Sequence, residues 1–127
     1  MADWVLDSSA VLASARGERG GDVAEAAFSD ALICAVNLAE VVTRLADVGL
    51  SMRQVRGLVE AGGFATVDFD QGLAYRTAAL RGVTRDLGLS LGDRACLALA
   101  ERESLPVLTA DRAWASLDIG VEIRLIR

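Results

Sequence analysis

The sequence contains no lysine and no histidine, and all 13 of its cationic residues are arginines. These absences exclude a lysine nucleophile, a histidine general base and a histidine metal ligand. Carboxylates must therefore carry any acid–base or metal chemistry. The 18 acidic residues give a formal net charge of −5, which excludes a generally basic nucleic-acid-binding protein.

Cysteine and proline are also scarce. The two cysteines, Cys34 and Cys96, stand alone without a CxxC motif, so we expect free buried thiols rather than a disulfide or a zinc site. No apolar run approaches the roughly 20 residues that a membrane helix needs, and the first residues do not resemble a signal peptide. We therefore expect a cytoplasmic protein. A single proline and 53% hydrophobic residues predict one folded domain over residues 1–127.

Short apolar runs alternate with alanine-rich stretches of helical spacing. The runs predict strands at residues 4–6, 31–36, 65–67, 106–109 and 121–126. The alanine-rich stretches predict helices at residues 10–15, 22–30, 38–48, 53–61, 71–87 and 91–104. Strands separated by helices favour parallel pairing with right-handed crossovers. We predict a three-layer α/β fold, whose central, mostly parallel sheet of four to five strands is flanked by helices. Its binding crevice should lie beyond the carboxyl ends of the strands.

Two aspartates follow predicted strands directly. Asp7 comes after the strand at 4–6, and Asp111 comes shortly after the strand at 106–109. Each could cap the following helix, because an aspartate side chain can accept a backbone N–H of the first turn. Parallel strands end at one edge of the sheet, so the two carboxylates could equally share a site there.

Asp93 has two interpretations of its own. Ser90 and Asp93 have the spacing of a capping box, which would explain the acid by helix capping alone. However, Asp93 also begins a stripe that continues with the apolar residues Cys96, Leu97 and Ala100. A carboxylate on an inward-facing stripe needs a partner, which favours a functional role.

The helical pattern around Glu40 indicates a surface acid. Asn37 and Glu40 could form a cap, and Glu40 lies on the polar side of the helix with Arg44 placed for an ion pair four residues on. Periodicity alone therefore predicts that Glu40 is solvated and not catalytic.

Other charged residues give weaker signals. Asp68 and Asp70 follow the strand at 65–67; Asp70 is most simply a helix cap, and Asp68 has no inward-facing companion. Arg94 and Arg112 stand beside candidate acids and could contact substrate phosphates or pair with carboxylates.

Convergence of Asp7, Asp93 and Asp111 at one edge would place like charges close together. Such a cluster is unfavourable unless some acids are protonated or a cation neutralises them. Mg²⁺ suits this task, because it takes one or two direct carboxylates and reaches others through water. A divalent ion held this way can activate water against a phosphodiester.

Four short segments together resemble a known family. They are VLDSSA at residues 5–10, AVNLAEV at 35–41, LSLGDRACLALA at 89–100 and LTADRAW at 108–114. In this order and spacing they are similar to PIN-domain ribonucleases, and specifically to VapC-type toxins of type II toxin–antitoxin systems. The resemblance spans essentially the whole chain.

The resemblance implies roles for individual residues. It implies an acidic quartet of Asp7, Glu40, Asp93 and Asp111, with Asp7 and Asp93 as direct Mg²⁺ ligands, and Mn²⁺ as a substitute. It matches Ser9 to a hydroxyl that supports the site. It also overrules the pattern-based interpretation of Glu40 and places this acid in the cleft. A fifth acid found in some relatives is missing, because residues 113–115 are apolar.

The resemblance further implies partners. These are a structured RNA substrate such as tRNA or rRNA, a cognate VapB-like antitoxin that covers the cleft, and a second copy of the chain in a homodimer. No membrane partner is expected.

Three alternatives stay open at this point. A PIN-domain nuclease of RNA processing would share the catalytic residues but have no antitoxin. A non-catalytic binding module would lack metal binding. A phosphoacceptor signalling domain would use Asp68, but such domains rely on a lysine, which this chain does not contain.

Overall fold

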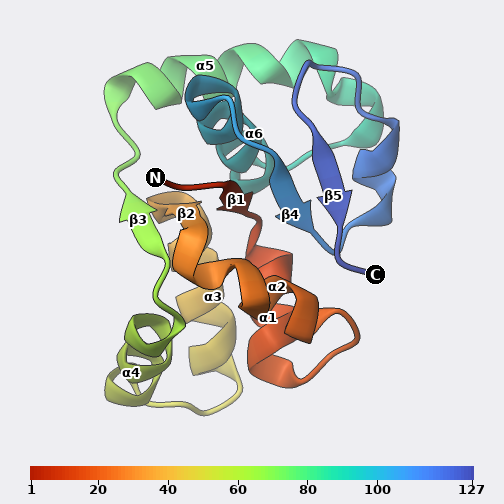
Figure 1. Ribbon diagram of the computed structural model, residues 1–127. Coiled ribbons are helices and arrows are strands. Elements are labelled where there is room, and N and C mark those ends of the chain that lie inside the picture. Colours follow the sequence, from red (N-terminus) through yellow and green to blue (C-terminus); the bar gives the residue numbers. More distant parts are fainter.

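The computed structural model describes residues 1–127 and has a five-stranded sheet at its centre (Figure 1). The strands are β1 (Trp4–Leu6), β2 (Ala31–Cys34), β3 (Ala65–Val67), β4 (Val107–Thr109) and β5 (Ile123–Leu125). Their order is β3-β2-β1-β4-β5, and every neighbouring pair is parallel. This arrangement confirms the predicted α/β fold with a central sheet flanked by helices.

Six α-helices and three short 3-10 helices connect the strands. The α-helices are α1 (Ser8–Arg16), α2 (Gly21–Ala27), α3 (Ala35–Asp47), α4 (Met52–Gly62), α5 (Gln71–Val83) and α6 (Leu91–Glu103). The 3-10 helices are η1 (Phe28–Asp30), η2 (Arg85–Leu87) and η3 (Arg112–Ser116). Two predicted helices, at 22–30 and 71–87, therefore end in a 3-10 turn. The predicted helix at 38–48 begins earlier, at Ala35, which matters for the site described below.

The helices divide between the two faces of the sheet. Side chains of successive strand residues point to opposite faces, so Leu6 and Val5, both fully buried, belong to different hydrophobic clusters. Leu6 packs with α1 to α4, whereas Val5 packs with α5, α6 and η3. Figure 1 shows these two groups of helices below and above the strands.

Helix α6 is the central helix of its layer. Its residues from Ala95 to Ala100 are each at most 1% exposed, because the sheet covers one side of the helix and α5 covers another. A helix buried on several sides is held more rigidly than a surface helix with a single apolar stripe. Groups on its first turn, at the carboxyl edge of the sheet, are therefore firmly positioned.

The two cysteines are free and buried, as predicted. Burial raises the pKa of both the Cys34 and the Cys96 thiol, so neither is prepared to act as a thiolate. None of the helices combines the length and hydrophobicity that crossing a bilayer requires.

Candidate active site

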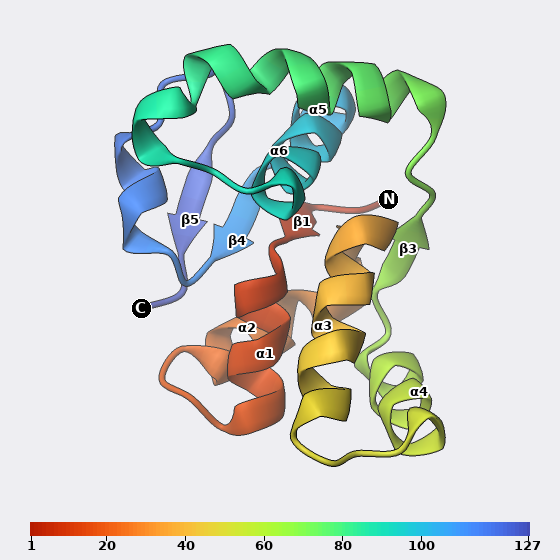
Figure 2. The same ribbon diagram turned by 180° about the vertical axis from the view of Figure 1, so that it is seen from behind.

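The carboxyl edge of the sheet forms an open cleft of about 850 Å³. Helices α1, α3 and α6 contribute most of its walls, and Figure 2 shows α1 and α3 side by side with α6 above them. All four predicted acids line this cleft: Asp7, Glu40, Asp93 and Asp111. They come from four separate segments of the chain, and the fold brings them together.

Asp7 is buried beside the end of β4. Its Oδ2 atom accepts hydrogen bonds from the Ser9 hydroxyl at 2.6 Å and from the Thr109 hydroxyl at 2.8 Å. The Ser9 hydroxyl in turn accepts a hydrogen bond from the backbone N–H of Ala110 at 2.9 Å. Asp7 occupies the N-cap position of α1, but its side chain makes no capping hydrogen bond. The capping interpretation of Asp7 was therefore wrong, since the carboxylate turns across the sheet edge to β4 instead.

The electrostatic environment of Asp7 opposes its ionisation. Burial, with a smaller contribution from the nearby charges of Asp93 and Glu40, raises the pKa of this carboxyl from 3.8 to about 6. The hydrogen bonds from Ser9 and Thr109 act in the opposite direction but do not compensate. A cation bound beside Asp7 would relieve this unfavourable situation.

The raised pKa predicts how the stability of the metal-free protein depends on pH. The folded-state pKa lies above the unfolded value of 3.8, so the stability linked to this group is full below pH 3.8 and is lost as pH rises through about 6. Asp7→Asn keeps an acceptor for Ser9 and Thr109 but cannot ionise. We expect it to raise the unfolding free energy at pH 8 by up to about 3 kcal/mol, with a smaller gain at pH 4.5.

Thermal unfolding in EDTA at several pH values measures this difference. Asp68→Asn is the control, because Asp68 is exposed and lies outside the cleft. A lower melting temperature of Asp7→Asn than of the wild type at pH 8 would contradict the prediction.

Glu40 lies in the cleft, contrary to the pattern-based prediction of a solvated surface acid. Its Oε1 atom accepts hydrogen bonds from the Ser8 hydroxyl at 2.6 Å and from the Asn37 amide at 3.0 Å. The predicted ion pair with Arg44 does not form. Asn37 is fully buried and is no cap, because α3 begins two residues before it, at Ala35.

Asn37 connects the Glu40 region to α6. Its amide nitrogen also donates to the Gly92 carbonyl at 2.9 Å. A Cβ atom at Gly92 would overlap the Glu40 carboxylate, so only glycine allows this side chain to lie against the first turn of α6. The position of Glu40 therefore depends on a contact between two helices that are distant in the sequence.

Asp93 and Asp111 combine local capping with a place in the cleft. The Oδ2 atom of Asp93 accepts from the backbone N–H of Ser90 at 3.0 Å and completes the predicted capping box. The Oδ1 atom of Asp111 accepts from the backbone N–H of Ala113 at 3.0 Å and caps η3. The two interpretations offered for each acid are thus compatible, because one carboxylate oxygen suffices for capping.

The two oxygens of each of the four carboxylates differ in their contacts. In each, one oxygen is engaged by hydrogen bonds, while the other accepts none within the chain. These second oxygens are Asp7 Oδ1, Glu40 Oε2, Asp93 Oδ1 and Asp111 Oδ2. The first turns of α1 and α6 also lie at this edge, and their N-terminal ends favour negative charge.

The donor set fits a hard divalent cation that stays partly hydrated. No group of three or more acidic or cysteine side chains is arranged to hold an ion on its own. Mg²⁺ does not require such a cage, since it commonly uses one or two carboxylates and several waters. Each of the four acids has one unengaged oxygen that could accept such an ion or its waters, and the cleft has room for water.

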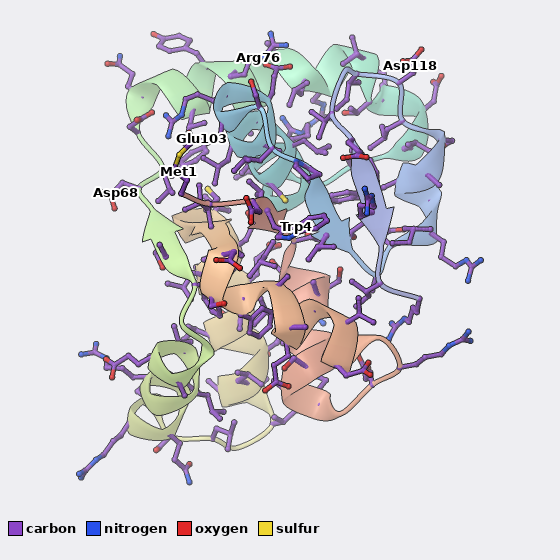
Figure 3. All side chains as sticks on the ribbon, in the orientation of Figure 1. Met1, Trp4, Asp68, Arg76, Glu103 and Asp118 are labelled. Carbon is purple, nitrogen blue, oxygen red and sulfur yellow. The ribbon has the colours of Figure 1, made fainter.

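The remaining candidates lie elsewhere. Asp68 is exposed and projects away from the molecule beside β3 (Figure 3). Asp70 caps α5 through the Leu73 N–H at 2.9 Å, as predicted. Arg94 is buried and donates to the Thr77 carbonyl at 2.9 Å, so it pairs with no carboxylate. Arg112 is exposed and does not line the cleft.

Sequence reasoning missed several residues that line the cleft or lie buried behind it. Ser8, Asn37 and Thr109 hold the carboxylates, and Arg16 and Arg44 lie farther along the cleft wall. A polar Thr109 at the end of an apolar strand was the one available signal, since the buried end of a strand rarely carries a hydroxyl without a partner. Nothing in the local pattern distinguishes Asn37 from a cap.

The family model of the PIN domain matches residues 4–120. The chain belongs to the PIN domain family. PIN domains are nucleases, so this assignment supports the nuclease prediction. No curated protein matches the sequence.

Several solved structures have folds similar to the fold of this PIN domain. The DNA-bound VapBC of Salmonella typhimurium has a TM-score of 0.77 at 18% identity, covering 100% of both chains. A toxin–antitoxin complex from Klebsiella pneumoniae has a TM-score of 0.77 at 22% identity, covering 98% of both chains. VapBC-5 from Mycobacterium tuberculosis has a TM-score of 0.61 at 25% identity, covering 100% of this chain and 99% of the other.

Proposed function

We propose that this PIN domain is a Mg²⁺-dependent endoribonuclease toxin of the VapC type. It would cleave a structured cellular RNA, such as a tRNA or an rRNA, in the cytoplasm. The observation that carries the proposal is the cleft itself, where four acids from distant segments meet and each leaves one oxygen unengaged.

The chain's own residues have separate tasks in this proposal. Asp7 and Asp93 would contact the ion, while Glu40 and Asp111 would accept hydrogen bonds from waters beside it, including the attacking water. Ser9 fixes the Asp7 carboxylate by donating to Oδ2, while Oδ1 accepts no hydrogen bond within the chain. When bound, the ion would neutralise charge on the scissile phosphate and lower the pKa of water.

The same proposal includes a cognate antitoxin and a homodimer. The structural relatives include VapBC complexes, in which a toxin is bound to its antitoxin. An antitoxin that places an arginine among the four carboxylates would block the cleft by charge-assisted hydrogen bonds. Because this chain is itself acidic around the cleft, a cationic group on the partner is the simplest complement.

The proposed function predicts that metal removal stops cleavage. The purified protein, incubated with total tRNA or rRNA and Mg²⁺ or Mn²⁺, should cut at a defined position, and excess EDTA should abolish the reaction. Without the ion, the carboxylates repel the phosphate, and no cation offsets the charge that Asp7 carries in its buried position. Sequencing of the RNA ends reveals the position. Cleavage that persists in EDTA at the same position would refute the metal requirement, and cleavage of neither RNA would refute the substrate class.

A further inference from the structure

The cleft continues beyond the acids along α1 and α3. On α1, Ser9, Leu12 and Arg16 follow at helical spacing and all line the cleft. On α3, Glu40 and Arg44 are one turn apart and line the facing wall. On each helix, the residues that face the cleft therefore run from the acidic site near the N-terminal end to an arginine near the C-terminal end.

These two arginines have no partner within the chain. Arg16 and Arg44 are exposed and take part in no ion pair or side-chain hydrogen bond. Arg127, which also lines the cleft, differs: it donates to the Arg19 carbonyl at 2.9 Å and lies 3.8 Å from a carboxylate oxygen of Glu18. Arg16 and Arg44 are thus the cations of the cleft that remain available to a ligand.

We propose that Arg16 and Arg44 form a phosphate-binding site for the RNA strand, next to the acidic site. This inference rests on the proposed function. A guanidinium binds a phosphate through two parallel hydrogen bonds, whereas the carboxylate end repels phosphates that no cation shields. The two arginines therefore position the strand so that a different phosphate reaches the acids.

Helix geometry sets the distance between the two sites. Arg16 lies seven residues after Ser9, which corresponds to roughly 10 Å along α1. A stacked nucleic-acid strand rises about 3.4 Å per nucleotide. The arginines would accordingly hold a phosphate about three nucleotides from the scissile one.

The local charge pattern favours a nucleic-acid strand here over a protein segment. With a net charge of −5, the chain repels RNA at long range, so binding must depend on local cations. A phosphodiester strand complements both ends of the cleft at once, through a metal ion at the acids and through guanidinium groups at the arginines.

Arg16→Gln, Arg44→Gln and the double variant test the site. Binding of a fluorescent 12-nucleotide single-stranded RNA is measured in the Asp93→Asn background, at several salt concentrations. Each substitution should weaken binding about tenfold. The binding constant K falls as the salt concentration rises. The double variant should make the negative slope of log K against log salt shallower by about 1.4, at about 0.7 per contact. In cleavage assays with the wild-type acids, KM should rise more than kcat falls.

The matched control is Arg53→Gln with Arg56→Gln, which removes the same charge from exposed positions of α4 outside the cleft. Thermal unfolding confirms that all variants are folded. The arginine site would be overturned if RNA binding and KM changed no more in the Arg16 and Arg44 double variant than in this control.

Two further outcomes separate this inference from the proposed function. Arginine-dependent RNA binding by a wild-type chain that cleaves no RNA would contradict the nuclease proposal and support the phosphate site. Unchanged RNA binding and cleavage in the double variant, with weaker binding of the cognate antitoxin, would contradict the phosphate site alone and assign the arginines to protein recognition.

Discussion

Asp93→Asn is expected to abolish RNA cleavage while the protein stays folded. An asparagine oxygen can still accept the Ser90 N–H and preserve the capping box at the start of α6. The substitution removes one of the two charges proposed to hold the ion. Losing several kcal/mol of electrostatic stabilisation corresponds to a rate at least about a hundredfold lower. Single-turnover cleavage of total tRNA and rRNA, with circular dichroism as the folding check, measures the effect.

The matched control for this prediction is Asp68→Asn. It makes the same chemical change at an exposed acid that lies outside the cleft, so the cleavage rate should not change. Undiminished cleavage by Asp93→Asn would show that this acid serves α6 as a cap and nothing more. Equal losses in both variants would point to long-range charge rather than to a site.

Gly92→Ala should separate activity from stability. Alanine favours a helix over glycine by up to about 1 kcal/mol, so α6 should not be destabilised by the backbone change. The new Cβ atom would occupy the space of the Glu40 carboxylate, which is the mobile end of its side chain and can turn away. We therefore expect a folded protein whose cleavage rate is lower by about a hundredfold, because small displacements of catalytic groups have large effects.

Gly57→Ala provides the comparison. Gly57 lies within α4, and a Cβ atom there would meet nothing within 4 Å. This variant should gain a similar helical stabilisation and cleave at the wild-type rate. Full activity of Gly92→Ala would mean that the position of Glu40 against α6 is not needed for the reaction. A large fall in its melting temperature would mean that Glu40 cannot move aside.

The fold could be predicted because its signals are local. Apolar runs and helical spacing identified all five strands and the six α-helices, though not the 3-10 helix η3, and parallel pairing followed from the length of the connections. The capping alternatives for Asp93 and Asp111 are confirmed, since the capping box of Ser90 and Asp93 and the cap by Asp111 depend on residues only two or three positions away. Because capping patterns involve only neighbouring residues, they could not decide whether the acids also face a cleft.

The position of Glu40 could not be predicted from the local sequence pattern. A helical wheel describes one helix and its own apolar face, but the cleft wall is formed where α3 meets α1 and α6. The partners that hold Glu40 are Ser8, 32 positions away, and Asn37, which itself depends on the Gly92 carbonyl of α6. Only the resemblance to a family placed this acid correctly. For a related reason local pattern could not decide between capping and a site for Asp7, because its hydroxyl partner Thr109 is 102 positions away.

The order of the strands in the sheet determines when the cleft can form during translation. Strand β1 comes first of the five in the sequence but lies in the middle of the sheet, and its neighbour β4 is translated only after β2 and β3. Until β4 emerges, Asp7 has no Thr109 beside it and Asp111 does not yet exist. The cleft therefore cannot be complete before β4 and the segment that follows it have been translated, however early β1, α1 and α3 fold.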